Sequence, residues 1–136
     1  MNRRVFVLAA LAVAGCQPAG RLVVACDPDL AAPLGAAAEA WARRKGLQGP
    51  EVTPLDARRL LAAAEATPGL VVATREPKLA DRLQRTGQVR LQNRWKPKIG
   101  GGEVQVVIVR GAGEGAGAAF GKWLMTDEAA AILTRP

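Results

Sequence analysis

The fold is decided by one stretch in the middle of the chain, LVVATREPKLADRL at residues 70–83. Its first four residues form an apolar run of strand length, which predicts a fully buried strand. Pro77 suits the first turn of a helix, and Leu79 and Leu83 then lie on one helical face. Gly87 follows as the expected helix terminator. This stretch therefore predicts a βα unit, a buried strand that leads through a short loop into a helix.

The chain before this stretch repeats the same order. Residues 22–25 predict a strand, and the apolar residues from Leu34 onward have the i, i+3, i+4 spacing of a helix that ends at Gly46. Residues 51–53 predict a second, weaker strand, and Asp56 is a suitable N-cap for the helix that follows. Two further βα units are therefore expected before the central one.

The chain after the central unit is less regular. Residues 90–102 are basic, contain Pro97 and end in three glycines, so we expect a loop there. Residues 104–109 are the clearest strand, and the glycines of residues 111–117 predict a turn before a final helix that carries Phe120. The whole order predicts an α/β fold, in which a small, mostly parallel sheet of four strands has helices on both faces.

Composition excludes several kinds of chemistry. The 136-residue chain has a formal charge of +7 and contains no His, Tyr or Ser. A Ser-His-Asp triad, a histidine general base and a His-ligated zinc site are therefore impossible. We expect a protein that is not an enzyme and that needs no cofactor.

The first 15 residues predict an export signal. Arg3 and Arg4 give a positive start, and the apolar residues 5–13 are too few to span a bilayer, which takes about 20 helical residues. The string VAGC at residues 13–16 resembles the lipobox of bacterial lipoproteins. The resemblance implies cleavage before Cys16, followed by a diacylglycerol thioether on its sulfur and acylation of its new amine. The alternative is an ordinary signal peptide followed by an incidental cysteine.

This resemblance also predicts the organisation and location of the protein. Residues 1–15 are expected to be the lipoprotein signal peptide, residues 16–20 a tether and residues 21–136 one folded lobe. A lipid anchor places the lobe at the periplasmic face of the cell envelope, and Gln17 after the anchor implies the outer membrane in a Gram-negative host. If Cys16 is acylated, Cys26 is the only thiol left, and we expect it to be buried rather than reactive.

The candidate binding residues come from the strand ends. Ligands in such sheets bind where strands lead into helices, here at residues 26–29, 54–56 and 74–76. The side chains of these loops that can bind a polar ligand are Asp27, Asp29, Thr53, Asp56, Thr74 and Arg75. For the three aspartates the competing interpretation is helix capping. Two carboxylates are too few for a hard metal cation, so no metal site is predicted.

Basic residues gather in one segment of the chain. Residues 75–98 contain eight basic residues and two acidic ones, which accounts for nearly all the excess positive charge of the chain after the signal segment. This segment can face anionic lipid or an acidic partner, or it can be a solvated surface. Nucleic acid is not expected as a partner of an exported protein. The basic residues are Arg75, Lys78, Arg82, Arg85, Arg90, Arg94, Lys96 and Lys98.

Several of these strings resemble the periplasmic substrate-binding proteins of ABC importers, specifically the molybdate-binding type. Residues 70–83 are similar to a strand, loop and helix of the family's first lobe. Residues 104–110, with Phe120 and residues 124–133 (LMTDEAAAIL), resemble its return strand and closing helices. The resemblance implies one lobe of a type II periplasmic-binding-protein fold, a small polar solute such as an oxyanion, and an ABC permease as partner.

The chain departs from this family in size. A second lobe would begin near Arg94, yet the return strand follows within about ten residues. One lobe leaves most of a ligand exposed, so a permease or a second copy would have to supply the other surface. The alternative is an interaction lipoprotein outside transport, which keeps the fold and docks on a partner or on anionic lipid through its basic segment.

Overall fold

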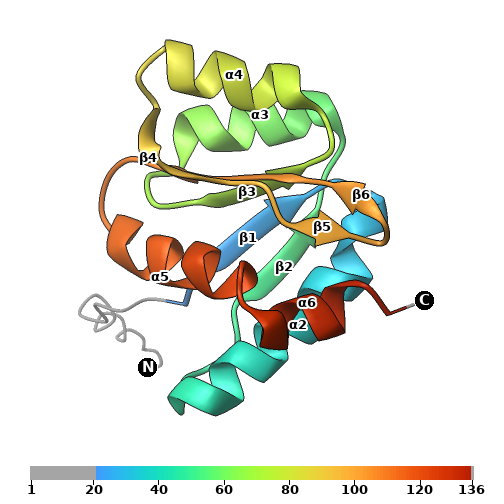
Figure 1. Cartoon of the computed structure of the whole chain (residues 1–136). Coiled ribbons are helices and arrows are strands. Elements are labelled where there is room, and N and C mark those ends of the chain that lie inside the picture. Colours follow the sequence, from blue (N-terminus) through green and yellow to red (C-terminus); the bar gives the residue numbers. More distant parts are fainter. Residues whose placement is uncertain (1–20, 136) are drawn as a thin grey trace, which may run out of the picture.

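The computed structural model describes residues 21–135. The predicted signal peptide, the tether and Cys16 lie outside the described residues. Within them, a five-stranded sheet is covered by α3 (Ala57–Ala66) and α4 (Pro77–Arg85) on one face. The helices α2 (Ala31–Lys45), α5 (Glu114–Leu124) and α6 (Asp127–Leu133) lie on the other face (Figure 1). The α/β class and the placement of helices on both faces are confirmed.

The first half of the described chain follows the predicted βα order. The strands β1 (Val23–Cys26), β2 (Glu51–Pro54) and β3 (Val71–Thr74) pair in parallel, with β1 in the middle. A short 3-10 helix, η1 (Pro28–Leu30), links β1 to α2. Two predicted helix ends are confirmed. Gly46 adopts a left-handed φ of 68° after α2, and Asp56 accepts the Arg59 N–H at 2.9 Å as the N-cap of α3.

The return strand makes the sheet mixed rather than mostly parallel. The strand order is β2-β1-β3-β7-β4, where β4 spans Val89–Trp95 and β7 spans Gln105–Val109. Because β7 is antiparallel to both β3 and β4, two of the four pairings are antiparallel. The chain enters β7 from the edge strand β4 without a crossover helix, and this connection is what reverses its direction.

The prediction of a loop over residues 90–102 is wrong. The region contains most of β4 and a small hairpin formed by β5 (Lys98–Ile99) and β6 (Gly102–Glu103). The prediction failed because β4 is an edge strand. Residues 90–92 are exposed, and only one of them is apolar, so the sequence lacks the buried apolar run that predicts a strand. The pairing of β4 with β7 also shifts register between Val89 and Arg94, which interrupts the strand pattern.

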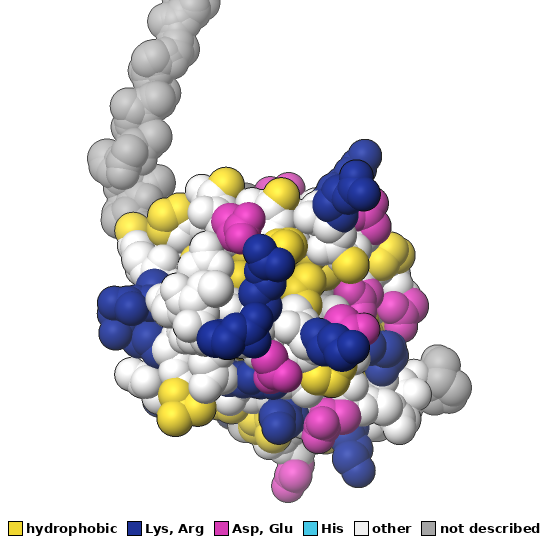
Figure 2. Space-filling view, turned by 90° about the horizontal axis from the view of Figure 1, so that it is seen from above, with side chains coloured by type: hydrophobic (Ala, Val, Ile, Leu, Met, Phe, Trp, Pro, Cys, Tyr) yellow, Lys and Arg dark blue, Asp and Glu magenta, His cyan; other side chains and the backbone are white. Residues whose placement is uncertain are grey.

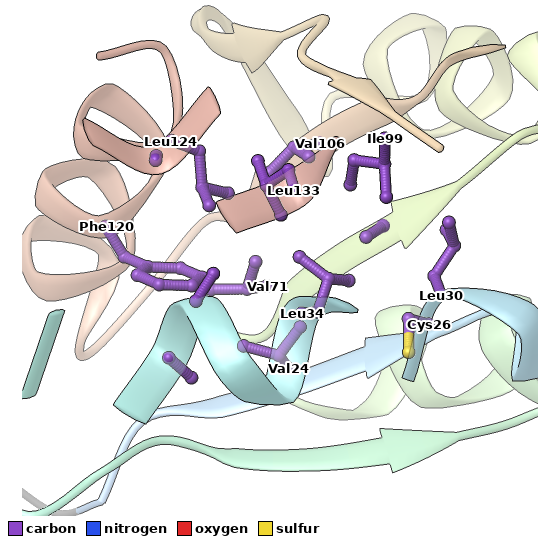
Figure 3. Close-up of a cluster of buried hydrophobic side chains, with 14 of the residues drawn as sticks. Val24, Cys26, Leu30, Leu34, Val71, Ile99, Val106, Phe120, Leu124 and Leu133 are labelled. Atoms are coloured by element: carbon purple, nitrogen blue, oxygen red, sulfur yellow. The ribbon is translucent and has the colours of Figure 1, made fainter. Parts of the chain in front are cut away.

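Alternating side chains of the central strands build two cores. Val24 and Cys26 of β1 point to the α2–α5–α6 face, and Ala25 points to the α3–α4 face. In β7, Val106 and Ile108 lie in the first core, while its other valines lie in the second. Figure 3 shows the first core, in which strand side chains meet side chains of the helices and Ile99 of the β5–β6 hairpin. Both faces are apolar, so both need covering helices.

The turn before β3, which contains Gly69, packs against the turn after β7, which contains Gly111. The Gly69 N–H donates to the Val109 carbonyl at 3.0 Å, and a Cβ on Gly69 would overlap the carbonyl oxygen of Ala112.

The turn expected over residues 111–117 is shorter than predicted, because α5 already begins at Glu114. Gly117 lies inside that helix, where a Cβ would approach Ile108 to 2.8 Å. This glycine permits close packing of α5 on the sheet.

Replacement of Gly69 by alanine should destabilise the protein more than the same replacement at Gly46. Both residues have positive φ, of 79° and 68°, so both substitutions introduce backbone strain of about 1–2 kcal/mol. Gly46 has nothing near its missing Cβ, whereas Gly69 faces backbone that cannot move aside. Urea denaturation should therefore give a loss for Gly69→Ala that exceeds the Gly46→Ala loss by at least about 1 kcal/mol. Equal losses would contradict the packing argument.

Candidate functional site at the β1–β3 switch point

The candidate site lies where the chain changes direction across the sheet. From β1 the chain passes through α2 to β2 on one side, and from β2 it passes through α3 to β3 on the other side of β1. The carboxyl ends of β1 and β3 are adjacent, with Cys26 paired to Ala73. Such a switch point opens a crevice in which α/β proteins bind ligands.

Asp27 and Thr74 connect the two strand ends. The Asp27 N–H donates to the Ala73 carbonyl at 3.2 Å, which extends the ladder by one bond. The Asp27 carboxylate oxygen Oδ2 accepts the Arg75 N–H at 2.7 Å and the Thr74 hydroxyl at 3.2 Å. The buried Thr74 hydroxyl also accepts the Glu76 N–H at 3.1 Å. Asp27 therefore joins two loops that are 48 residues apart in sequence.

Arg75 bridges the switch point to the β5–β6 hairpin. Its Nε donates to Asp29 Oδ2 at 2.8 Å, and its Nη2 donates to the Ile99 carbonyl at 3.1 Å. The hairpin can approach this closely because Gly102 lacks a side chain, and a Cβ there would be 3.0 Å from Arg75 Nη1. Ile99 itself is fully buried in the core below. The hairpin thus covers one side of the guanidinium.

The predicted ligand residues divide into two groups. Asp27, Asp29, Thr74 and Arg75 form one hydrogen-bonded set, which we call the switch-point cluster. Asp56 caps α3, as the competing interpretation predicts, and Asp27 and Asp29 make no side-chain cap bond to η1. Half-buried Thr53 lies in β2 opposite Ala25 and shares no hydrogen bond with the cluster within residues 21–135.

The charges of the cluster limit what it can bind. Two carboxylates and one guanidinium leave it with a formal charge of −1. The Arg75 N–H and guanidinium, which are the donors an anion would use near the start of α4, already hold carboxylates. An anionic solute must therefore compete with Asp27 and Asp29. Across the described residues, no three Cys, Asp or Glu side chains are grouped to hold a metal ion.

Four of the eight side chains in the basic segment form ion pairs with acidic side chains. Arg94 donates to Gln84 and Gln105, bonds Asp81 at 2.8 Å and is only 14% exposed, so it cross-links β4, β7 and α4. Figure 2, a view of the α3–α4 side, shows Lys and Arg side chains interspersed with Asp and Glu rather than gathered in one patch. Ion pairs engage Arg75, Arg82, Arg90 and Arg94 with Asp29, Glu65, Glu114 and Asp81.

Glu114 is an important polar residue that the sequence analysis did not identify. Its carboxylate accepts Arg90 Nε at 2.8 Å, Asn93 Nδ2 at 2.7 Å and the Gly111 N–H at 3.2 Å. Desolvation acts to raise the pKa of Glu114, but these hydrogen bonds and the charge of Arg90 outweigh it and lower the pKa below its usual value. Glu114 thereby holds the irregular part of β4 against the start of α5. The one sequence signal for this role is that Glu114 is an acidic residue at the start of a helix, where a negative charge is favourable.

The Cys26 thiol lies directly beneath the cluster. It is fully buried at the carboxyl end of β1, where desolvation and the charges of Asp27 and Asp29 raise its pKa to about 11. Because the thiolate is the reactive form, the folded protein keeps this cysteine inert at neutral pH.

A separate shallow groove lies at the opposite end of the sheet. It has a volume of about 300 Å³ and is lined by residues before β3 and β4 and after β7, including Glu65, Gln88 and Arg110. None of the predicted ligand residues borders it.

No helix in the part of the chain that the structure describes is both long enough and apolar enough to cross a bilayer.

Comparison with known proteins provides no family assignment. No protein-family model matches the chain, and no curated protein is detectably similar to it in sequence. Interpretation of the site therefore depends on its own geometry.

Replacement of Glu114 by glutamine should lower stability in a pH-dependent way. A carboxyl whose pKa is lowered in the folded state stabilises the protein fully above its usual pKa, and this benefit is lost as the pH falls through the lowered value. Thermal denaturation at neutral pH should show Glu114→Gln less stable by about 1 kcal/mol, with the difference shrinking in acid. Glu65→Gln is the control, because Glu65 is about half exposed and lies 3.9 Å from Arg82. Equal effects of the two changes would refute this account.

Cys26 should resist alkylation in the folded protein. At pH 8 we expect iodoacetamide to modify Cys26 only after denaturant is added, because the folded thiol is buried and its pKa of about 11 leaves little thiolate. Peptide mapping by mass spectrometry distinguishes Cys26 from Cys16. Rapid modification of Cys26 without denaturant would contradict its burial.

Proposed function

We propose that the protein is a lipid-anchored, single-lobe relative of the solute-binding proteins of ABC importers. In this proposal Cys16 carries the lipid at the periplasmic face of the envelope, and the switch-point cluster contacts a small polar solute. The observation that carries the proposal is the convergence of Asp27, Asp29, Thr74 and Arg75 at the point where ligands of α/β sheets bind.

The strand order supports the solute-binding-protein type of fold. The edge strand β4 and the return strand β7 are adjacent and antiparallel, with Trp95 paired to Val106. A chain that left this lobe after β4 and returned through β7 would need no other change in the sheet. The β5–β6 hairpin lies between these strands in the chain, where a second lobe would be inserted. This arrangement fits one lobe of a type II periplasmic-binding-protein fold.

The charge of the cluster bears on the kind of solute. The family resemblance implies an oxyanion such as molybdate, which would have to displace Asp27 and Asp29 from Arg75. A solute that carries an ammonium group can instead bind the carboxylates while Arg75 stays in place. In either case a second surface on the open side of the site, from an ABC permease or from a second copy of this chain, would strengthen the binding.

One observation favours a second candidate function. Arg75 is held by both Asp29 and the hairpin carbonyl of Ile99, so the cluster satisfies its own hydrogen bonds without a solute. A lobe in this state can act as an interaction lipoprotein outside transport. In the basic segment proposed for docking on a partner or on anionic lipid, the residues outside ion pairs with described carboxylates are Lys78, Arg85, Lys96 and Lys98.

Equilibrium binding tests the two functions. Titration calorimetry of the whole chain with molybdate, with amino acids and with divalent cations should give micromolar or tighter binding for one class. Arg75→Gln should weaken that binding at least roughly tenfold, because it removes the guanidinium that would pair with an anionic solute and that holds Asp29 in place for a cationic one. Arg82→Gln is the matched control, since Arg82 lies on α4 and pairs only distantly, at 3.9 Å, with Glu65.

The outcome separates the candidates. Binding that Arg75→Gln weakens and Arg82→Gln does not would support solute capture. The absence of binding for every solute class, together with salt-sensitive binding to a protein or to lipid, would refute it and favour the interaction lipoprotein.

A further inference from the structure

A second group of basic side chains, outside the basic segment, lies at the amino end of the sheet where β1 and β2 begin. Arg43, Arg44 and Lys45 are exposed in the last turn of α2, and exposed Arg21 precedes β1. Figure 1 shows the end of α2 and the start of β1 on the same side of the molecule. Arg21 Nε donates to the Gly49 carbonyl at 2.7 Å, which ties it to the loop after α2. We call these four residues the α2-end cluster.

We propose that the α2-end cluster rests on the anionic headgroups of a phospholipid bilayer. The inference depends on the proposed anchor at Cys16, which only residues 17–20 separate from Arg21. A fully extended chain advances at most about 3.6 Å per residue, so the five steps from Cys16 to Arg21 span at most roughly 18 Å. The anchor therefore keeps this end of the lobe close to the membrane surface.

The four cations of the α2-end cluster exceed the acidic residues around them by one. Glu128 pairs with Arg44 at 3.1 Å, and Glu39 and Glu51 lie nearby in α2 and β2. Within residues 21–135, by contrast, no carboxylate comes within 4.0 Å of Arg43 or Lys45. Cations near a bilayer are attracted by its negative surface potential, and the attraction falls off within a Debye length. Arg43 and Lys45 are therefore the side chains expected to contribute most.

An exposed apolar side chain adds to this surface. Leu47, two residues after α2, is 57% exposed and is one of only three large hydrophobic residues exposed in the described chain. Its neighbours Gly46 and Gln48 are also exposed, so the loop projects from the helix end. A basic turn followed by a projecting leucine can place cations at the phosphates and an apolar group just below them.

This contact would orient the whole lobe. β1 runs from Val23, next to the α2-end cluster, to Cys26 beneath the switch-point cluster. The two clusters thus lie at opposite ends of the strand. With the α2-end cluster on the bilayer, the switch-point cluster faces away from it, open to solute and to a partner protein.

Vesicle flotation of the whole chain carrying Cys16→Ala tests the contact without any lipid anchor. We expect more binding to vesicles of phosphatidylglycerol and phosphatidylcholine than to phosphatidylcholine alone, and added salt should abolish the difference. Arg43→Gln with Lys45→Gln should weaken the phosphatidylglycerol-dependent binding roughly tenfold. The signal segment, with Arg3 and Arg4, is present in every variant, so its own affinity cancels in the comparison.

A matched pair controls for net charge. Arg58→Gln with Arg135→Gln removes the same charge from exposed positions outside the cluster and should leave binding unchanged. Equal loss in both pairs, or equal binding to both kinds of vesicle, would overturn the proposal. Circular dichroism melting of each variant checks that it is folded, and the charge reduction can be confined to Lys45→Gln if the pair melts early.

A separate measurement addresses the anchor. Incorporation of labelled fatty acid into the unaltered chain, and its loss in Cys16→Ala, tests the lipoprotein proposal alone. Absence of label together with cluster-dependent vesicle binding would refute the anchor and show only that the α2-end cluster itself has affinity for anionic lipid. Label without cluster-dependent binding would do the reverse.

Discussion

Burial of both faces of the sheet is the constraint on which the rest of the structure depends. The strands β1, β3 and β7 are almost continuously buried, so apolar side chains leave the sheet in both directions and helices must cover each face. To supply helices to both faces, the chain has to move outward from β1 in both directions. That requirement creates the switch point between β1 and β3, and with it the place where Asp27 and Arg75 meet.

The switch-point cluster has a structural role, and the proposed binding role would use the same groups. Asp27 fastens two strand ends, and Arg75 fastens the β5–β6 hairpin to the cluster. Because the same donors would bind a solute, a ligand gains affinity only by replacing bonds that already exist. In the proposed function, a single lobe with a satisfied site would capture solute through contacts that a partner surface strengthens.

The fold, rather than the distribution of charge along the sequence, decides which Lys and Arg side chains are paired with carboxylates. Three arginines of the basic segment pair with acidic residues of α3, α4 and α5, and one of them, Arg94, is an internal cross-link. The α2-end cluster has less charge, yet Arg43 and Lys45 are exposed and make no ion pair within the described residues. Proximity to an anchor matters because it raises the effective concentration of even a weakly attractive surface.

The sequence by itself determined the βα units, the caps at Asp56 and Gly46, the core residues and the polar loops at the strand ends, because each depends on neighbours within a few positions. Only the tertiary structure decided that β7 lies antiparallel beside β3, that residues 89–95 form an edge strand, and that Glu114 holds them. These features depend on contacts between distant segments. An edge strand with one solvated side carries no continuous apolar pattern, and a carboxylate's partners become known only when the chain has folded around it.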